Sequence, residues 1–267
     1  MITPKEINKS AAQYRVSDRQ IEKDYILTWV LYGIANHNTL STALVFKGGT
    51  VLKKCYIEDY RFSEDLDFTL LNNSFTHDDF KKLLAEVFDW VKEEANITLQ
   101  HKAEEIHDSS GSSQLYIDYL GPLGGNIGSR DIKIDITRGE KMEFDVEERK
   151  VFIGYSDLPE DSFTLPCYQL SEILIEKMVA LMGRTEPRDL YDFWYLTEIE
   201  RLSVKDHTIE FRSKASHKKQ NPDEFAAKVL KKEKVFERDW KEKLQNQIHD
   251  LPKYADVFRK SKRHLRS

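Results

Sequence analysis

The sequence predicts an α+β protein in which a mixed-sheet lobe with helices is followed by a helical lobe. Apolar residues recur at helical spacing over residues 21–34, whereas residues 65–70 alternate between apolar and polar, as a half-buried strand does. From Ser171 onward the pattern is almost wholly helical. We therefore expect two domains, an α/β lobe over residues 1–165 and a helical lobe with a basic tail over residues 166–267.

The composition excludes several classes of protein. The chain has 267 residues, of which 33% are charged and 40% hydrophobic, as is typical of a globular protein with a sizeable core. Its apolar stretches are shorter than the roughly 18–20 residues of a membrane span, and its N-terminal residues do not resemble a secretion signal. Cys55 and Cys167 cannot form a disulfide framework, and their neighbours do not indicate a zinc site. We expect a cytoplasmic protein with no membrane contact.

Charge is distributed unevenly along the chain. Residues 200–267 contain 19 Lys and Arg against 11 Asp and Glu, a net charge of +8. The other 22 basic and 35 acidic residues give residues 1–199 a net charge of −13. The two net charges, +8 and −13, sum to the −5 of the whole chain. An acidic body suits a metal or nucleotide site, and a basic tail suits a polyanion. A solvated helical tail explains the same charges equally well.

The predicted elements of the first lobe begin with a helix capped at Ser17, where Gln20 completes a capping box. A short buried strand over residues 43–46 ends at two glycines, and a short helix starts directly after them. The alternating strand of residues 65–70 follows, and then Thr76 caps the next helix. Further strands are expected over residues 97–100, 114–120 and 131–137, and helices over 171–184, 188–198, 222–232 and 234–249.

Two carboxylates share one face of the alternating strand. Asp65 and Asp67 point the same way because they are two residues apart, whereas Leu66 and Phe68 point to the other face, which can be the core. Asp135 lies in a second alternating strand, so the three acids converge if the two strands are neighbours. Carboxylates this close repel one another unless cations lie among them, and Mg²⁺ prefers such oxygen ligands. The alternative is a set of ordinary solvent-facing acids.

Two glycines and a serine accompany the acidic strand. Gly48 and Gly49 lie at a strand-to-helix junction, where free backbone amides bind phosphate. Ser63 comes two residues before Asp65 and is placed to donate to a phosphate oxygen. A tight turn and the end of a loop are the simpler explanations of these residues. Their combination with the acids favours a metal-dependent site for a phosphorylated substrate.

A lysine on the first helix of the second lobe shares a face with apolar residues. Lys177 is costly there without a partner, which a phosphate or an acid would supply. Asp189 and Asp192 lie three residues apart on the next helix, so they present two acids on one face. They can hold Lys177 or Arg184 in place, or orient an acceptor hydroxyl. Alternatively, the stem of Lys177 covers the core while its ammonium reaches water.

Together these motifs resemble the AbiEii/AbiGii toxin family of nucleotidyltransferases, which belongs to the DNA polymerase β-like superfamily. The matching segments occur in the family's order and span residues 22–196, about two thirds of the chain. They are Glu22–Tyr25, Phe46–Leu52, Arg61–Phe68, the strand with Asp135, Glu176–Leu181 and Arg188–Leu196. Two departures concern the site: 15 residues separate Gly49 from Asp65, more than in the shortest superfamily patterns, and Thr50 stands where many members have serine.

The resemblance implies a nucleotidyltransferase-like first lobe and roles for individual residues. Asp65, Asp67 and Asp135 would bind Mg²⁺ or Mn²⁺, and Lys177 and Asp189 would join them as catalytic residues. The implied nucleotide-binding residues are Gly48, Gly49, Thr50, Ser63, Lys177 and Arg188.

The expected reaction is the metal-dependent transfer of an NMP from an NTP to a hydroxyl. The family resemblance implies that the 3′ end of tRNA, or another RNA, is the acceptor, and that the protein is a toxin with a cognate antitoxin protein. The part of the basic tail from Lys214 through Arg266 would then contact the RNA backbone. The alternatives are transfer of the NMP to a protein, a non-catalytic nucleotide-binding module that acts through a protein partner, and a metal-dependent nuclease.

Overall fold

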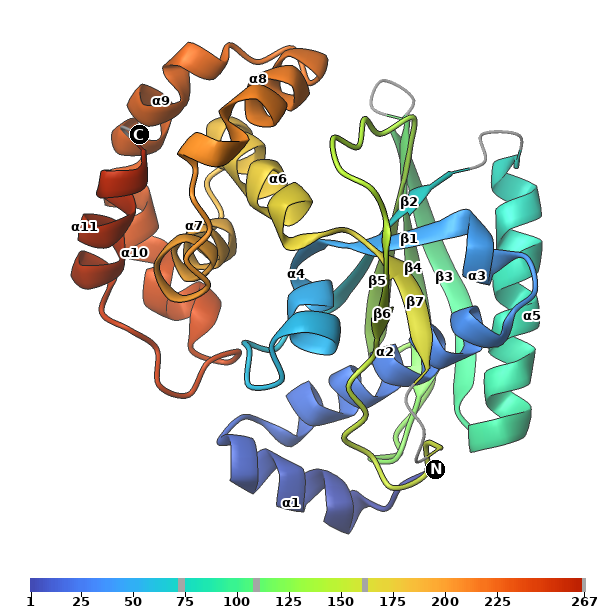
Figure 1. Ribbon diagram of the computed structural model, residues 1–267. Coiled ribbons are helices and arrows are strands. Elements are labelled where there is room, and N and C mark those ends of the chain that lie inside the picture. Colours follow the sequence, from blue (N-terminus) through green and yellow to red (C-terminus); the bar gives the residue numbers. More distant parts are fainter. Residues whose placement is uncertain (72–74, 108–110, 160–162, 266–267) are drawn as a thin grey trace. The chain divides into compact units, whose positions relative to one another are not determined.

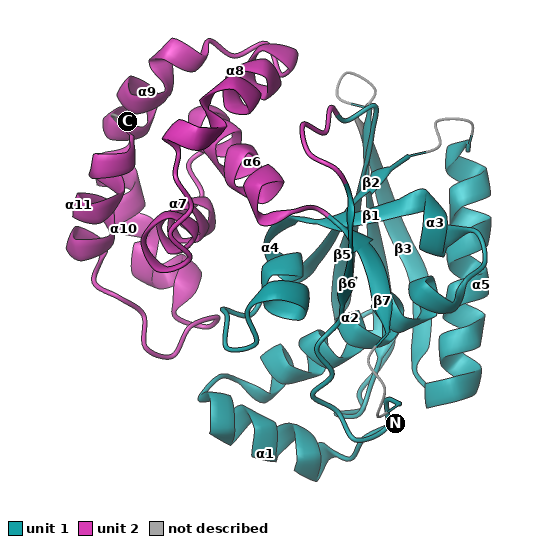
Figure 2. Cartoon of the chain, viewed as in Figure 1, with its two compact units in different colours: residues 1–140, 146–167 teal, residues 141–145, 168–267 magenta. Residues whose placement is uncertain are grey.

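The chain forms two compact units (Figure 1; Figure 2). The structure, a computed structural model, describes residues 1–71, 75–107, 111–159 and 163–265. Unit 1 comprises residues 1–140 and 146–167, and unit 2 comprises residues 141–145 and 168–267. The short segment 141–145 was expected in the first lobe but belongs to unit 2. The domain limits drawn at residues 165 and 166 remain a prediction.

The strands of the described residues form one seven-stranded mixed sheet, and all of it lies in unit 1. They are β1 Leu44–Lys47, β2 Asp65–Leu70, β3 Thr98–His107, β4 Ser112–Leu120, β5 Asp131–Arg138, β6 Glu147–Lys150 and β7 Thr164–Cys167. Their order across the sheet is β3-β4-β5-β2-β1-β7-β6. β2 therefore lies between β5, to which it is parallel, and β1, to which it is antiparallel. The mixed sheet and its helices confirm the predicted α+β class.

The centre of the sheet has one apolar and one polar face. Leu66 and Phe68 of β2 are fully buried and lie opposite Ile134 and Ile136 of β5. The residues between them in each strand point the other way, because successive strand residues alternate between the two faces. These intervening residues, Asp67 and Asp135, are two of the three acids of the predicted site, and each is half-buried. Core packing on one face thus fixes which side chains line the other.

The helices of unit 1 include two long ones that pack against each other, α2 and α5 (Figure 1). The set is α1 Pro4–Tyr14, α2 Asp18–Asn36, α3 Leu40–Ala43, α4 Gly48–Val51 and α5 His77–Ala95, with a π-helical turn, Leu52–Tyr56, directly after α4. Ser17 caps α2 by accepting the amide of Gln20, as predicted. Thr76 and Asp79 form a reciprocal capping box at the start of α5. α5 in turn contacts β3.

Four elements of unit 1 were not predicted: α1, α3, β6 and β7. Only Ile7 and Ala11 of α1 are buried, which is too short an apolar stripe to indicate a helix from the sequence. β6 reads Glu-Glu-Arg-Lys and has no apolar alternation, so its pairing with β7 defines it. β3 also extends beyond its predicted end at Gln100, because β4 pairs with its exposed distal half.

Unit 2 is helical, as predicted for this part of the chain. Its helices are α6 Leu170–Gly183, α7 Pro187–Trp194, α8 Thr208–His217, α9 Phe225–Lys231, α10 Glu233–Leu244 and α11 Tyr254–His264, with shorter turns at Tyr195–Ile199, Lys205–His207 and Pro222–Glu224. Asn221 caps the turn before α9, as predicted. α8 and α11 were not predicted, because most of their residues are polar. Buried aromatic residues, among them Phe193, Phe236 and Phe258, form the core of this unit.

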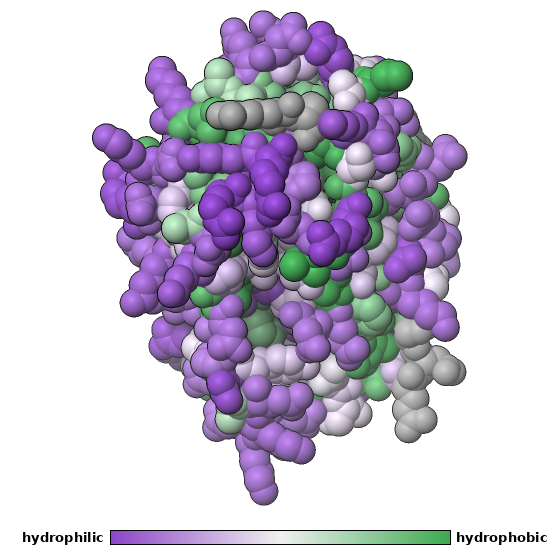
Figure 3. All heavy atoms as spheres, turned by 60° about the vertical axis from the view of Figure 1, so that its left-hand side comes forward, coloured by the Kyte–Doolittle hydropathy of each residue, from purple (hydrophilic) through white to green (hydrophobic). Residues whose placement is uncertain are grey.

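Hydrophilic residues predominate on the molecular face shown in Figure 3. Within the described residues, every helix is either too short or too polar to cross a membrane. Cys55 and Cys167 are free and buried, and their sulfur atoms lie 3.8 Å apart.

Candidate active site

Three acidic side chains lie on two adjacent strands at the polar face of the sheet. In the parallel register of β2 and β5, Asp67 lies opposite Asp135, and Asp65 lies opposite Lys133. Asp65 and Asp67 share a face because Leu66 between them is directed into the core. The structure therefore brings together three carboxylates that lie up to 70 residues apart in the sequence.

The glycine turn lies directly beside the second acid. β1 pairs with β2 so that Lys47 is opposite Asp67, and the chain then turns at Gly48, where φ is +80°. A Cβ atom at Gly48 would lie 2.1 Å from Oδ2 of Asp67, well inside van der Waals contact. Glycine is thus required at position 48 for two reasons: the backbone is in the left-handed region, and the carboxylate of Asp67 leaves no room for a Cβ atom.

The residues after the turn tie it to the start of β2. The Thr50 hydroxyl donates a hydrogen bond to the backbone carbonyl of Asp65, and both Thr50 and Gly49 are buried. Ser63 is buried in the segment that leads into β2. These contacts hold the first turn of α4 close to the acidic strand. The predicted roles of Gly48, Gly49, Thr50 and Ser63 in binding phosphate remain predictions.

A lysine lies between the carboxylates. Nζ of Lys133 is 2.7 Å from Oδ2 of Asp135 and 3.6 Å from Oδ2 of Asp65. Burial by itself lowers the pKa of Lys133, but the hydrogen bond to Asp135 and the charges of Asp65 and Asp67 outweigh it and raise the pKa. Lys133 is therefore held as a cation within the acidic site. The sequence carried the signal for it, because residues 133 and 135 share a strand face.

A second lysine lies at the edge of this site and is paired with a buried acid. Nζ of Lys47 is 3.6 Å from Oε2 of Glu140, and the two side chains are 9% and 2% exposed. Lys47 is the residue opposite Asp67 across β1 and β2. Glu140 lies beyond the end of β5, and no pattern in the sequence indicated that it would reach back to β1.

The chemistry of the donors suits a divalent cation. Three half-buried carboxylates supply hard oxygen atoms, and the ammonium of Lys133 already places positive charge among them. With the side chains in these positions, no set of three Asp, Glu, His or Cys residues in the described part of the chain is arranged to hold a metal ion. Asp65, Asp67 and Asp135 therefore fit a cation by the chemistry of their oxygen donors, whereas metal ligation by them remains a prediction.

α2 anchors the loop that leads into β5. Glu22 is fully buried, and its carboxylate accepts hydrogen bonds from the guanidinium of Arg130 and, at 2.8 Å, from the backbone amide of Leu123. Both partners belong to the turn between β4 and β5. The next residue of the helix, Lys23, lies 3.5 Å from Glu64, which immediately precedes β2. Neighbouring positions of one helix thus hold the approaches to both acidic strands.

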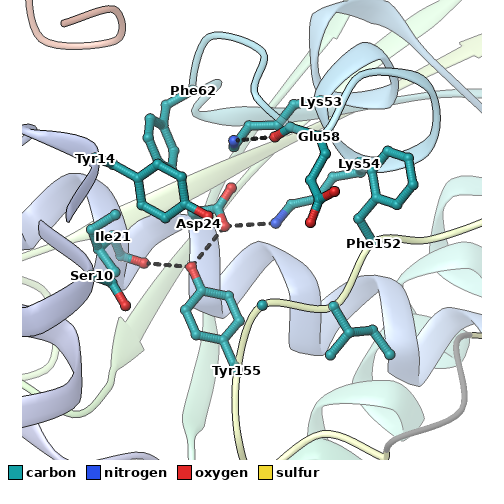
Figure 4. Close-up of a pocket in the computed structure, with 12 residues that line it drawn as sticks. Ser10, Tyr14, Ile21, Asp24, Lys53, Lys54, Glu58, Phe62, Phe152 and Tyr155 are labelled. Atoms are coloured by element: carbon teal, nitrogen blue, oxygen red, sulfur yellow. Dashed lines mark hydrogen bonds and ion pairs between the residues drawn. The ribbon is translucent and has the colours of Figure 1, made fainter.

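The following residue of α2 anchors the segment after the glycine turn. Asp24, Lys54 and Tyr155 point toward one another beside a cavity of about 50 Å³ (Figure 4). Oδ2 of Asp24 is 2.6 Å from Nζ of Lys54 and accepts the hydroxyl of Tyr155 at 2.7 Å. Burial alone raises the pKa of Asp24, but the charges of Lys54 and Lys53 outweigh it and lower the pKa. Asp24 is therefore a buried carboxylate that stays ionised.

The predicted lysine and second acid pair with each other in unit 2. Nζ of Lys177 is 2.8 Å from Oδ1 of Asp189 and 2.8 Å from Oδ2 of Asp192. Nε of Arg184 donates to Asp189 over 2.7 Å. The expectation that these acids hold Lys177 or Arg184 is thus met for both cations. Arg188, in the first turn of α7, is half-buried. The catalytic or nucleotide-binding roles of Lys177, Asp189 and Arg188 remain predictions.

Asp189 should make the stability of the protein depend on acid pH. Burial raises the pKa of Asp189, but Lys177 and Arg184 outweigh burial and lower the pKa. Its stabilising contribution is therefore complete above the unfolded value of about 3.9 and is lost as the pH falls through the lower folded value. At pH 7 we expect the free energy of unfolding of Asp189→Asn to be about 2 kcal/mol lower than that of the wild type, which is the usual cost of losing hydrogen bonds to a charged group.

Urea unfolding of the wild type and Asp189→Asn at a series of pH values measures this difference. The difference should narrow as the pH is lowered below about 4, because Asp189 then becomes protonated in the unfolded chain, and it should vanish at the lower pH at which the folded carboxylate is protonated too. Asp239→Asn, which removes a half-buried acid of α10 paired with the exposed Arg238, is the control and should leave stability nearly unchanged. A difference that stays constant from pH 7 to pH 3 would contradict this explanation.

The basic tail is used in part for contacts within unit 2. Lys214, where the predicted RNA-contacting stretch begins, is 1% exposed, and its ammonium pairs with the buried carboxylate of Glu172. Nζ of Lys232 binds the backbone carbonyls of Leu181, Met182 and Arg184 near the end of α6. Lys214 is therefore unable to contact an RNA backbone, which corrects the expected extent of that stretch. Its predicted end, Arg266, lies outside the described residues.

Solved structures share this fold. One is JHP933 from Helicobacter pylori, with a TM-score of 0.56 and 17% identity, over 94% of this chain and 92% of that one. Another is MenT4, a nucleotidyltransferase toxin from Mycobacterium tuberculosis, with a TM-score of 0.54 and 19% identity, over 75% of this chain and 73% of that one. A search of curated proteins found no match.

The amino-acid sequence places the chain in the class of the nucleotidyltransferases. The model of the family described as nucleotidyl transferase AbiEii toxin, type IV toxin–antitoxin system, matches residues 29–261. The chain belongs to this family, which confirms the resemblance drawn from the motifs. It is therefore a nucleotidyltransferase and the toxin of a type IV toxin–antitoxin system.

Proposed function

We propose that the protein transfers an NMP from an NTP to a hydroxyl of an RNA, with the 3′ end of tRNA as the acceptor. The hydroxyl oxygen attacks the α-phosphorus and forms a new P–O bond. The bond from the α-phosphorus to the oxygen bridging to the β-phosphorus breaks, and pyrophosphate leaves. Asp135 accepts the proton of the attacking hydroxyl. The products are the nucleotidylated acceptor and pyrophosphate.

The observation that supports this proposal is the register of the two acidic strands. Asp67 and Asp135 lie directly opposite each other, Asp65 shares their face, and Gly48 brings the backbone turn against Asp67. Asp65, Asp67 and Asp135 would hold Mg²⁺ or Mn²⁺, which when bound neutralises phosphate charge and lowers the pKa of the attacking hydroxyl. The backbone amides at Gly48 and Gly49 would orient the triphosphate. Lys177 and Asp189 are proposed to contribute to catalysis from unit 2.

The acceptor and the partner are proposed on the basis of family membership. A type IV toxin implies a cognate antitoxin protein, and RNA is the target that the family resemblance implies. Transfer to a protein hydroxyl is the principal alternative, because the same acids would activate any positioned hydroxyl. The non-catalytic binding module and the nuclease are disfavoured, since the family is one of nucleotidyltransferases.

The test incubates the purified chain with Mg²⁺, total tRNA and each α-labelled NTP in turn. We expect label on tRNA with at least one NTP, and no label with Asp67→Asn or Asp135→Asn. Periodate oxidation of the tRNA removes its terminal cis-diol and should abolish labelling. Asp131→Asn is the matched control, because Asp131 lies on the same strand but pairs with Lys102 at 2.7 Å, at the other end of β5.

Each outcome assigns the reaction differently. Label on protein would replace RNA by a protein acceptor and keep the chemistry. Cleaved RNA without incorporated label would overturn the transferase proposal in favour of a nuclease. Lys177→Ala and Asp189→Asn, assayed beside the strand variants, test whether unit 2 contributes: undiminished transfer by both would remove these residues from the catalytic set.

A further inference from the structure

The acidic site contains its own cation. The ammonium of Lys133 bridges Asp135, at 2.7 Å, and Asp65, at 3.6 Å, and the Lys133 side chain is 25% exposed. Asp65 and Asp135 belong to the three acids proposed to bind the metal. The lysine and its two partners sit on one sheet face in a fixed parallel register, so the contact follows from strand pairing rather than from a loose loop.

This arrangement solves an electrostatic problem of the metal-free protein. Three half-buried carboxylates on adjacent strands repel one another, and each loses hydration, unless positive charge lies among them. Lys133 supplies that charge, and it does so by engaging two carboxylates that a metal would also need.

We propose that Lys133 is a resident counter-ion that competes with the metal for Asp65 and Asp135. In the metal-free protein it balances the charge of the acids and holds Asp135 away from a ligating position. Binding of the metal requires these two contacts to break, so Lys133 lowers the affinity of the site for the metal alone. This inference rests on the proposed function, because it concerns the same three acids.

Substitution of Lys133 tests both parts of this proposal, the balance of charge without metal and the competition with the metal. Lys133→Met keeps the length of the side chain but removes its charge. We expect it to bind Mn²⁺, without nucleotide, roughly tenfold more tightly than the wild type in isothermal titration calorimetry, since it no longer has a competitor. In the absence of metal it should unfold at a lower temperature than the wild type, and saturating Mn²⁺ should raise its Tm more than that of the wild type. Neither readout depends on catalysis.

A matched control exists on the same sheet. Lys102 bridges Asp131 at 2.7 Å and Asp118 at 3.2 Å, so it also joins two acids of neighbouring strands. Lys102→Met should leave Mn²⁺ affinity unchanged, because none of the three site acids contacts it. Lys133→Gln serves as a second variant of Lys133, and should behave as Lys133→Met does if charge rather than shape is responsible.

The outcomes distinguish this proposal from the proposed function. If Asp67→Asn abolishes Mn²⁺ binding but both Lys133 variants bind Mn²⁺ no more tightly than the wild type, the counter-ion proposal is wrong and the metal site stands. If Mn²⁺ binds equally to the wild type and Asp67→Asn, the acids are not the metal site and both proposals fail. If Mn²⁺ binds to neither the wild type nor the Lys133 variants, the counter-ion proposal is wrong, and labelling of tRNA decides the proposed function. If the two Lys133 variants bind Mn²⁺ more tightly than the wild type, while Lys102→Met does not and Asp67→Asn loses binding, both proposals are supported.

Discussion

Gly48→Ala is expected to reduce nucleotide transfer by about 100-fold or more, the cost of displacing a catalytic group by roughly 1 Å. The added Cβ would lie 2.1 Å from Oδ2 of Asp67 and 2.8 Å from its Cγ, so the carboxylate must move. The backbone cannot relieve the clash at low cost, because φ at this position is +80° and an L-residue there is itself strained. Activity should therefore fall although no acidic residue has been removed.

The measurement compares transfer of label by Gly48→Ala with that by Gly124→Ala. Gly124 also has a positive φ, +64°, but a Cβ there meets nothing within 4 Å. Gly124→Ala therefore imposes backbone strain in the same unit without a clash, and it should lower stability slightly and leave transfer close to that of the wild type. Equal activity of Gly48→Ala and the wild type would show that Asp67 does not need its present position.

Asp24→Asn is expected to lower the free energy of unfolding by about 3–5 kcal/mol, the range for breaking a buried ion pair. Asp24 and Lys54 are 5% and 4% exposed, and their charged atoms lie 2.6 Å apart. Loss of the carboxylate charge leaves the buried ammonium of Lys54 beside neutral groups, among them the Thr28 hydroxyl, the new amide and the ring of Tyr155. Urea unfolding at pH 7 measures the loss.

A double variant tests the cause of that loss. Asp24→Asn/Lys54→Met removes both charges and should be more stable than Asp24→Asn alone, since no uncompensated charge is left in the interior. Lys23→Met, which breaks the partly exposed pair with Glu64, is the control and should cost less than about 1 kcal/mol. If Asp24→Asn unfolds like Lys23→Met, the Asp24–Lys54 pair does not stabilise unit 1.

Much of the proposed site could be predicted, because the alternation of residues along a strand determines which side chains share a face. The alternation through Leu66 and Phe68 assigns Asp65 and Asp67 to one face without knowledge of the partner strand. Asp135 required a condition, that its strand be adjacent, and the parallel pairing of β2 with β5 meets it. The apolar stripe around Lys177 likewise indicated that this lysine needs a partner, either a phosphate or an acid, and Asp189 and Asp192 pair with it.

The parts that could not be predicted depend on contacts between distant segments. Glu140 pairs with Lys47, 93 residues earlier in the sequence, and no sequence pattern around either residue indicates that the two are in contact. β6 has no hydrophobic alternation, and it is a strand because β7 supplies its hydrogen-bonding partner. Lys133 could have been assigned to the acidic face from its spacing to Asp135, but its role as a bridge requires the register of two strands.

The anchors along α2 also bear on when unit 1 folds during synthesis of the chain. Glu22 reaches Arg130 over 108 residues of chain, and Asp24 reaches Tyr155 over 131. Contacts of such long sequence separation form late, because the chain must close a large loop before they stabilise anything. A nascent chain that has emerged only as far as β5 already carries all three acids but lacks Tyr155. We therefore expect unit 1 of a growing chain to remain incompletely folded until Tyr155 has been translated.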